Sequence, residues 1–358
     1  MLRQQKRSTQ GTSAISRISQ NQCHSVAALL IVACVTTVRS RADRPVFESG
    51  AVTFRNTSVE LPQRFQLADH EFEFTQRFMK RWGQLVDVFE VSFPSPVETE
   101  HAVNNNVACE YFRPIAFDHS PDKNPGVIVL HILGGDFELS RTICRTFAAK
   151  GIGSLFLKMP YYGPRRPAGS KRRMISTDLD ETVAGMTQAV LDIRRGTAWL
   201  AARPEIDRER IGITGISLGG IVGCLAAENE PRLKRGCFVL AGGDLPVIVM
   251  ESDEMKKVRD ANREVDRDRA VKLLAQVDPL TYASALVDRD VLMFNAKNDK
   301  VVPPACTDKL WNQLGRPKIE WWNANHYSAI VYLPKGLVQI TTFFGEADWN
   351  RAASKDGS

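Results

Sequence analysis

A serine lies between two glycines in the segment Gly215-Ile216-Ser217-Leu218-Gly219. The residues before it, 210–215, have the composition of a strand, and residues 218–228 have that of an apolar helix. A serine at a sharp strand-to-helix turn is exposed at the tip of the turn, and flanking glycines let the neighbouring backbones approach closely. The pattern predicts that Ser217 is a nucleophile that attacks a carbonyl carbon.

A serine hydroxyl is a weak nucleophile until a base takes its proton. Of the six histidines in the chain, one follows the serine in sequence, and that is His326. It lies in the polar segment 323–328, directly after an expected strand at 319–322. A loop at the carboxyl end of a strand is where this chemistry needs a base, so His326 is predicted to be the general base.

The third group should be a carboxylate that holds the imidazole in the correct tautomer. Asp299 lies on the loop that follows an expected strand at 291–295. Asp278, Asp288 and Asp290 precede that strand and would lie at its other end. Asp299 is therefore predicted to be the orienting acid, which gives the chain order serine, acid, histidine.

The elements around these residues alternate. From about residue 84, short β-rich runs alternate with longer helical ones, which is typical of a mostly parallel sheet with helices on both faces. Segment 245–285 interrupts the alternation and is predicted to be a small helical lid insert. Phe72, Phe74 and Phe78 suggest a helical extension before the sheet. The expected organisation is a targeting segment at 1–42, the extension at 43–83, a catalytic domain at 84–346 and a tail at 347–358.

Together, the strands, the serine turn, the acid and the histidine resemble the α/β-hydrolase superfamily over residues 84–346. Segments 201–212 and 278–279 resemble those of the dienelactone hydrolase, acetyl xylan esterase and prolyl oligopeptidase-type branch. The resemblance implies an α/β fold and a serine esterase that acts on a short acyl or acetyl ester through an acyl-enzyme. It implies no cofactor.

The same resemblance suggests where a tetrahedral oxyanion would bind. One donor is the backbone N–H of Leu218, directly after the serine. The segment His131-Ile132-Leu133-Gly134-Gly135 follows an expected strand at 127–131 and resembles the H-G-x-G-G loop of this fold, although Ile132 stands where a glycine is usual. This match makes the backbone N–H of Leu133 the second donor, with Gly134 as the alternative.

The loop 160–167 should leave the sheet at the same carboxyl edge as the serine, where ligands bind in open α/β sheets. Tyr162, Arg165 and Arg166 are therefore predicted to line the entrance and to contact substrate. A guanidinium could hold a carboxylate or the hydroxyls of a glycoside ester. The alternative is that the tyrosines pack beneath the insert and the arginines face solvent or pair with its acids.

Two further function classes stay open. A serine peptidase of the prolyl oligopeptidase type would share this catalytic domain, although no repeated all-β region that could form its propeller is present. A non-catalytic binding protein could use the same fold. No H-E-x-x-H motif and no pair of cysteines at zinc-ligand spacing occurs, so no metal and no nucleotide cofactor is expected.

Composition is that of a folded soluble protein, with 43% hydrophobic and 25% charged residues. The net charge of +6 comes from residues 1–42, which hold six basic residues and no acidic one. The rest of the chain is neutral, so a nucleic-acid partner is not expected. A small-molecule ester is the expected partner, and the oligomeric state is open.

Residues 1–42 have a basic start, an uncharged apolar run at 26–38 and small residues after it, which is the pattern of an export signal. The run is too short to span a bilayer. A periplasmic or secreted location is predicted, with a lipid anchor at Cys34 as an alternative. The five later cysteines are expected to be buried free thiols, with a disulfide between two of those other than Cys224 and Cys237 as the alternative in an exported protein.

Overall fold

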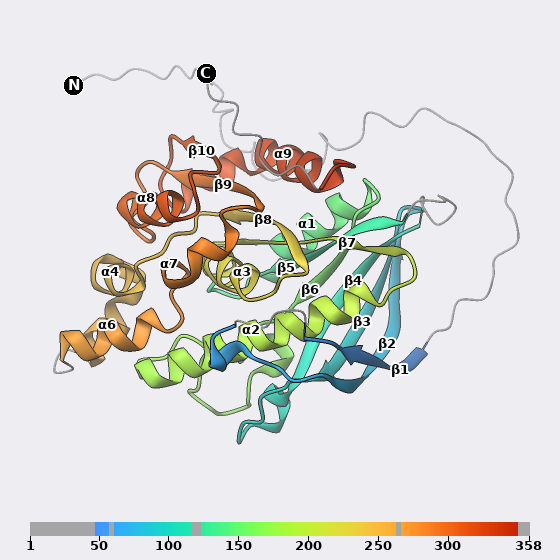
Figure 1. Ribbon diagram of the computed structural model, residues 1–358, viewed down its shortest axis with the longest axis horizontal. Coiled ribbons are helices and arrows are strands. Elements are labelled where there is room, and N and C mark those ends of the chain that lie inside the picture. Colours follow the sequence, from blue (N-terminus) through green and yellow to red (C-terminus); the bar gives the residue numbers. More distant parts are fainter. Residues whose placement is uncertain (1–46, 57–60, 116–122, 263–265, 350–358) are drawn as a thin grey trace, which may run out of the picture. The chain divides into compact units, whose positions relative to one another are not determined.

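The computed structural model describes residues 47–56, 61–115, 123–262 and 266–349. The predicted targeting segment 1–42 and most of the tail lie outside these ranges. The described residues form a ten-stranded sheet in the order β1-β2-β3-β4-β6-β5-β7-β8-β9-β10 (Figure 1). Its first four strands pair antiparallel and are Phe47–Phe54, His70–Trp82, Val86–Pro94 and Asn106–Pro114.

The other six strands of the sheet run parallel to one another, and β6 joins them to β4 by antiparallel pairing. Every residue of β5 and β6 is buried, as expected for parallel strands that are covered on both faces. The predicted mostly parallel sheet is confirmed. Strands β5 to β10 are Asn124–Leu130, Gly153–Leu157, Ile206–Ile216, Leu233–Val239, Asp290–Ala296 and Lys318–Trp322.

Helices cover both faces of the sheet (Figure 1). On one face, α1 (Phe137–Ala148) packs against α9 (Leu333–Gly345), and the rings of Phe147 and Phe344 meet edge to face. On the other face lie α2 (Leu179–Ala201) and α3 (Leu218–Glu228). Trp199 of α2 contacts aromatic rings from β2 and β4 there. These two apolar layers give the sheet its buried faces.

The described part of the segment 245–285 is mostly helical, and its role as a lid stays a prediction. Its helices pack against one another and against α2 and α3 (Figure 1). Val258 and Leu274 are buried in the same apolar layer as α3. The helices of this insert are α4 (Leu245–Glu251), α5 (Lys256–Ala261), α6 (Arg267–Ala275) and α7 (Pro279–Tyr282), and α8 (Pro304–Gln313) follows β9.

The prediction of a helical extension at 43–83 is wrong. In the described part of this segment, the chain forms β1 and β2, which extend the same sheet. Phe72 and Phe74 are buried whereas Glu71 and Glu73 are exposed, so side chains alternate with the period of two that belongs to a strand. The alternation continues through Phe78, and a register shift follows between Phe78 and Lys80. Phe74 and Phe78 lie four residues apart, a spacing that also fits one face of a helix.

No helix among the described residues is long and apolar enough to cross a membrane. The last described residue, Trp349, is buried and packs against Phe344 of α9. Residues 347 and 348 of the predicted tail are exposed, but Trp349 is part of the core, and residues 350–358 lie outside the described ranges.

Candidate active site

Three polar side chains meet at the carboxyl edge of the parallel strands. Ser217 directly follows β7, Asp299 lies three residues after β9, and His326 lies four residues after β10. Each was predicted on a loop after a strand, and parallel strands bring the ends of such loops together. The structure places all three residues in hydrogen-bond contact.

The contacts form one chain of hydrogen bonds. His326 Nδ1 lies 2.7 Å from Asp299 Oδ2, and His326 Nε2 lies 2.9 Å from Ser217 Oγ. Asp299 is 5% exposed, and its other oxygen accepts the backbone N–H groups of Val301 and Val302. With the carboxylate held in this way, Nδ1–H donates to Asp299, and the lone pair of Nε2 is directed at the Ser217 hydroxyl.

Ser217 lies on a strained turn. Its φ of 56° and ψ of −120° are rarely adopted by a residue with a side chain. A Cβ atom at Gly215 would lie 2.3 Å from the Gly219 carbonyl oxygen, and one at Gly219 would lie 2.7 Å from that of His131. Both glycines of the motif are therefore required for close backbone approach, as the sequence predicted. The Ser217 N–H donates to the carbonyl oxygen of Val239 and so fixes the turn to the next strand.

The loop that follows β5 is fixed by a buried histidine. His131 Nδ1 lies 2.9 Å from the Ile132 carbonyl oxygen, and its Nε2 accepts the Met159 N–H at 3.1 Å. Burial lowers the pKa of His131 to about 4 and the charge of Lys158 acts in the same direction, although the hydrogen bond to Ile132 opposes them. The imidazole is therefore neutral at pH 7, with its proton on Nδ1.

This histidine controls the direction of the predicted oxyanion donor. The Ile132 carbonyl accepts both His131 Nδ1–H and the Gly135 N–H, the latter at 3.0 Å. A carbonyl and the following N–H belong to one planar peptide unit, so fixing the Ile132 carbonyl also fixes the Leu133 N–H. From the sequence, His131 is expected only as the first residue of this loop. Its position at the end of a buried strand was the available signal for a structural role.

The two predicted oxyanion donors belong to the helix after Ser217 and to the loop after β5. Leu218 is the first residue of α3, so its N–H has no acceptor within the helix. Leu133 lies in the turn after β5 and lines the same cavity as Ser217. Gly134, the alternative donor, lines that cavity as well.

A cavity of about 510 Å³ opens in front of Ser217 and His326. Glu254 of the insert reaches this cavity and accepts a short hydrogen bond from the Tyr327 hydroxyl, next to His326. Glu254 and Asp136 are its acidic side chains, and both are exposed. The rest of the lining is mostly apolar and includes Ile132, Leu133, Leu139, Ile216, Val239, Leu240, Val301, Trp322, Ala329, Ile330 and Leu333.

The rival acids have other roles. The carboxylate of Asp278 accepts the N–H groups of Asp244, Leu245 and Leu280, so it caps the first turns of two helices of the insert. Asp290 lies at the start of β9 and pairs with Arg235 at 2.9 Å. Neither contacts His326, as expected from their place before the strand.

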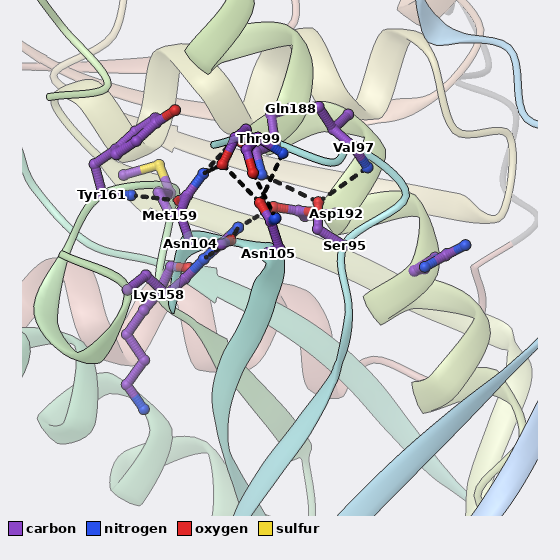
Figure 2. A network of polar contacts seen from close by, with 12 residues as sticks. Ser95, Val97, Thr99, Asn104, Asn105, Lys158, Met159, Tyr161, Gln188 and Asp192 are labelled. Atoms are coloured by element: carbon purple, nitrogen blue, oxygen red, sulfur yellow. Dashed lines mark hydrogen bonds and ion pairs between the residues drawn. The ribbon is translucent and has the colours of Figure 1, made fainter. Parts of the chain in front are cut away.

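The prediction that Arg165 contacts substrate is wrong, because its side chain is fully buried. It pairs with Asp192 of α2 at 2.8 Å and donates to the carbonyl oxygens of Asn104 and Lys158. Figure 2 shows the surrounding network, in which Asn104 contacts Gln188 and Tyr161 and in which Ser95 donates to Asp192. Arg165 therefore anchors the loop 160–167 to α2 and does not extend from that loop towards a substrate.

Tyr162 and Arg166 border a second cavity, of about 400 Å³. The ring of Tyr162 lies 4.5 Å from that of His131, so it packs against the loop after β5. Arg166 is exposed. Leu133 and Gly134 line this cavity as well as the catalytic one, so the two cavities lie on the same loop.

The five cysteines that the structure describes, Cys109, Cys144, Cys224, Cys237 and Cys306, are buried free thiols, as expected. Burial raises their pKa values, so they are poor nucleophiles at neutral pH. Across the described ranges, no group of three or more histidine, cysteine or acidic side chains is arranged to hold a metal ion.

The solved structures that resemble this chain in fold include two acetyl xylan esterases. The acetyl xylan esterase from Paenibacillus sp. R4 is 18% identical with a TM-score of 0.60 over 75% of this chain and 87% of that one. The acetyl xylan esterase 1 from Thermoanaerobacterium sp. JW/SL YS485 is 16% identical, with the same TM-score and coverage. At these identities the likeness concerns the fold.

Sequence comparison finds relatives and two family models. Uncharacterized proteins of Mycobacterium tuberculosis strains CDC 1551 and H37Rv are 27% identical over 183 residues, which span 49% of this chain and 42% of theirs. The prolyl oligopeptidase family model matches residues 186–328, a range that holds the serine, acid and histidine. The model of alpha/beta hydrolase domain containing 18 matches residues 63–242. The chain therefore belongs to the alpha/beta hydrolase domain containing 18 family, within the α/β-hydrolase superfamily.

Proposed function

We propose that this chain is a serine hydrolase that cleaves a carboxylic ester with a short acyl or acetyl group. The observation that carries the proposal is a pair of hydrogen bonds, which join Ser217 to His326 and His326 to Asp299 at the wall of a mostly apolar cavity. An ester offers an electrophilic carbonyl for the serine and an apolar chain for the cavity. The names of the two similar acetyl xylan esterases agree with an acetyl ester as the substrate.

In the proposed first half-reaction, Ser217 Oγ bonds to the ester carbonyl carbon while its proton passes to His326 Nε2. The carbonyl π electrons move to the oxygen, and the N–H groups of Leu218 and Leu133 stabilise the resulting oxyanion. Asp299 accepts Nδ1–H and offsets the positive charge of the imidazolium. The intermediate then expels the alcohol oxygen, which takes the proton from Nε2 and leaves an acyl-serine.

In the second half-reaction, water replaces the alcohol. His326 Nε2 takes a proton from the water as its oxygen bonds to the acyl carbon. The same backbone donors stabilise the second oxyanion, and collapse of this intermediate returns the proton to Ser217 Oγ. The acid is released, and no cofactor takes part in the proposed steps.

The test is covalent labelling together with turnover. A fluorophosphonate probe should label Ser217, and Ser217→Ala should lose labelling and lower kcat by several orders of magnitude on 4-nitrophenyl esters of graded acyl length. Ser284→Ala, at an exposed position of the insert, is the matched control and should keep both. Unchanged turnover in Ser217→Ala would contradict the proposal.

A serine peptidase is the second candidate, because the prolyl oligopeptidase family model covers all three proposed catalytic residues. The two candidates differ in the bond that is broken. Purified protein assayed on short aryl esters and on proline-containing peptide anilides separates them. Hydrolysis of the esters without measurable release of the anilides supports the esterase, and the reverse supports the peptidase.

A further inference from the structure

The second cavity adjoins the catalytic cavity at the loop after β5. Leu133 and Gly134 line both cavities. The second cavity, of about 400 Å³, is bounded on its other sides by the loop that follows β6 and by Arg173 and Ile175. A molecule bound at Ser217 therefore has to cross the Leu133–Gly134 segment to reach it.

The charged side chains that line this second cavity are both positive. They are Arg166, which is exposed, and Arg173, which is partly buried. Arg173 Nη1 donates to the carbonyl oxygens of Ser170 and Arg172, which hold its guanidinium in place without neutralising it. Within the part of the chain that the structure describes, neither Arg166 nor Arg173 has a carboxylate partner, and no acidic residue lines this cavity.

Tyr162 adds a neutral donor to the same lining. Burial raises the pKa of Tyr162 to about 12, with the charge of Arg173 acting in the opposite direction. The hydroxyl therefore stays protonated at neutral pH and can donate to an anion. Its ring is fixed against His131, which gives the hydroxyl a defined position.

The catalytic cavity has charges of the other sign. Asp136 and Glu254 line it, and both are exposed. An anionic group is repelled by these carboxylates and attracted by the arginines across the loop. The two cavities therefore favour a substrate with an uncharged end at the serine and an anionic end beyond Leu133.

We propose that the second cavity is an anion-binding subsite, in which Arg166, Arg173 and Tyr162 hold a carboxylate or phosphate group carried by the ester substrate. Guanidinium groups present several fixed donors and bind such groups by charge-assisted hydrogen bonds. The inference rests on the proposed esterase function and narrows its substrate to esters that bear an anion. Arg165, in contrast, takes no part in binding, because it is buried with Asp192.

The test compares matched esters at pH 7.5. Mono-4-nitrophenyl adipate carries a carboxylate, 4-nitrophenyl 5-phosphonopentanoate carries a phosphonate, and 4-nitrophenyl hexanoate is a neutral ester of similar length. Wild-type kcat/KM should be higher for at least one anionic ester than for the neutral one, and 0.5 M NaCl should reduce this preference. The larger preference identifies the carboxylate or the phosphate as the natural group.

Variants assign the preference to the cavity. Arg166→Ala and Arg173→Gln should each lower kcat/KM for the preferred anionic ester about 10- to 100-fold, mainly through KM, and leave the neutral ester within about twofold. Arg166→Lys should lose less, because it keeps the charge. Arg208→Ala is the control, since Arg208 is exposed at the opposite end of β7, and it should leave both substrates unchanged.

The alcohol side of the ester is tested in the same way. If the anion belongs to the alcohol, 4-acetoxybenzoate should be hydrolysed faster than its methyl ester, with the same dependence on Arg166. Arg166→Ala could change kcat/KM equally for anionic and neutral esters in both the acyl-side and the alcohol-side series, or change it for none of them. Either result would contradict the proposed subsite without contradicting the proposed esterase function. Failure of wild-type protein to hydrolyse any of these esters would contradict the proposed function itself.

Discussion

Arg165 Nη2 donates to Asp192 Oδ2 across 2.8 Å, and neither side chain is exposed to solvent. Burial favours the neutral form of Asp192 and raises its pKa, against the opposing charge of Arg165. A buried pair of this kind depends on each partner, because removing one leaves the other charge without compensation. The pair joins the loop after β6 to α2, and through the loop it supports the region beside the candidate active site.

The first prediction concerns this pair. Arg165→Met or Asp192→Asn should each lower the free energy of unfolding by about 3–5 kcal/mol. The double variant Arg165→Met/Asp192→Asn should cost less than the sum of the two single changes, because it leaves no uncompensated charge. Urea denaturation measures all three. The control is Arg166→Met, at the exposed neighbouring position, which should change the free energy of unfolding by less than about 0.5 kcal/mol. If Arg165→Met and Asp192→Asn changed it as little, the pair would not contribute to stability.

The second prediction separates two aspartates. Asp299→Asn should fold normally and lower kcat about 10⁴-fold, because an amide at Oδ2 no longer fixes His326 with its proton on Nδ1. Asp278→Asn should destabilise the protein, since its carboxylate accepts three backbone N–H groups, and should leave kcat of the folded fraction almost unchanged. Thermal melting and ester turnover, measured together, test both. The opposite assignment of losses would move the orienting acid to Asp278.

A third prediction concerns two glycines of α3. A Cβ atom at Gly219 would lie 2.7 Å from the His131 carbonyl oxygen and 2.9 Å from that of Leu130, and neither backbone atom can move without shifting β5. Gly219→Ala should therefore impair both stability and turnover.

Gly223, one helical turn later, is the matched control for that change. A Cβ atom at Gly223 meets nothing closer than 3.7 Å. Gly223→Ala should raise stability by about 0.5–1 kcal/mol, because alanine loses less backbone entropy in a helix. Equal melting temperatures for the two alanine variants would contradict the close approach at Gly219.

The fourth prediction follows from His131. Its pKa in the folded protein is about 4, below its ordinary value of 6.5, so between these values the unfolded chain binds a proton that the folded protein excludes. The contribution of neutral His131 to the free energy of unfolding is fully present above pH 6.5. It is lost as the pH falls from 6.5 towards 4, by up to about 3 kcal/mol. Urea unfolding at a series of pH values measures this loss.

His131→Gln should show a flatter dependence of stability on pH over that window than wild type does. His101→Gln, in the loop before β4, serves as the control and should retain the wild-type slope. If His131→Gln also retained that slope, the acid sensitivity would belong to other groups.

The serine, acid and histidine could be predicted because each follows a short apolar strand that is readable in the sequence. The ends of β7 and β9 that lead to Ser217 and Asp299 are buried, so their apolar runs are continuous and easy to recognise. β10, before His326, is an edge strand that is mostly half-buried, and it is recognised by its short run of Ile319, Trp321 and Trp322. The order of the parallel strands then brings the following loops together without further information. The geometry at Ser217 depends on glycines whose spacing is equally local.

The two features that the sequence does not predict, strand β2 and the burial of Arg165, depend on contacts between distant segments. β2 is exposed on one face, and its residues Phe74 and Phe78 lie four apart, a spacing that fits a helix as well as a strand. Nothing in the loop after β6 reveals that Arg165 turns inward to α2, since its partner lies 27 residues later. A single acid among apolar neighbours, Asp192 between Leu191 and Ile193, was the one local sign of a buried partner.

During synthesis of the chain, β5 is made well before one of the strands that it pairs with. β5 pairs with β6 and β7, and β7 begins at Ile206, some 75 residues after β5 ends. At roughly 5–20 residues per second, the ribosome needs about 4–15 s to deliver that second neighbour. For this interval a strand that is apolar from Val127 to Leu130 keeps one unpaired edge, which is the kind of surface that aggregates. The yield of soluble protein is therefore expected to depend on chaperones that protect this edge during translation.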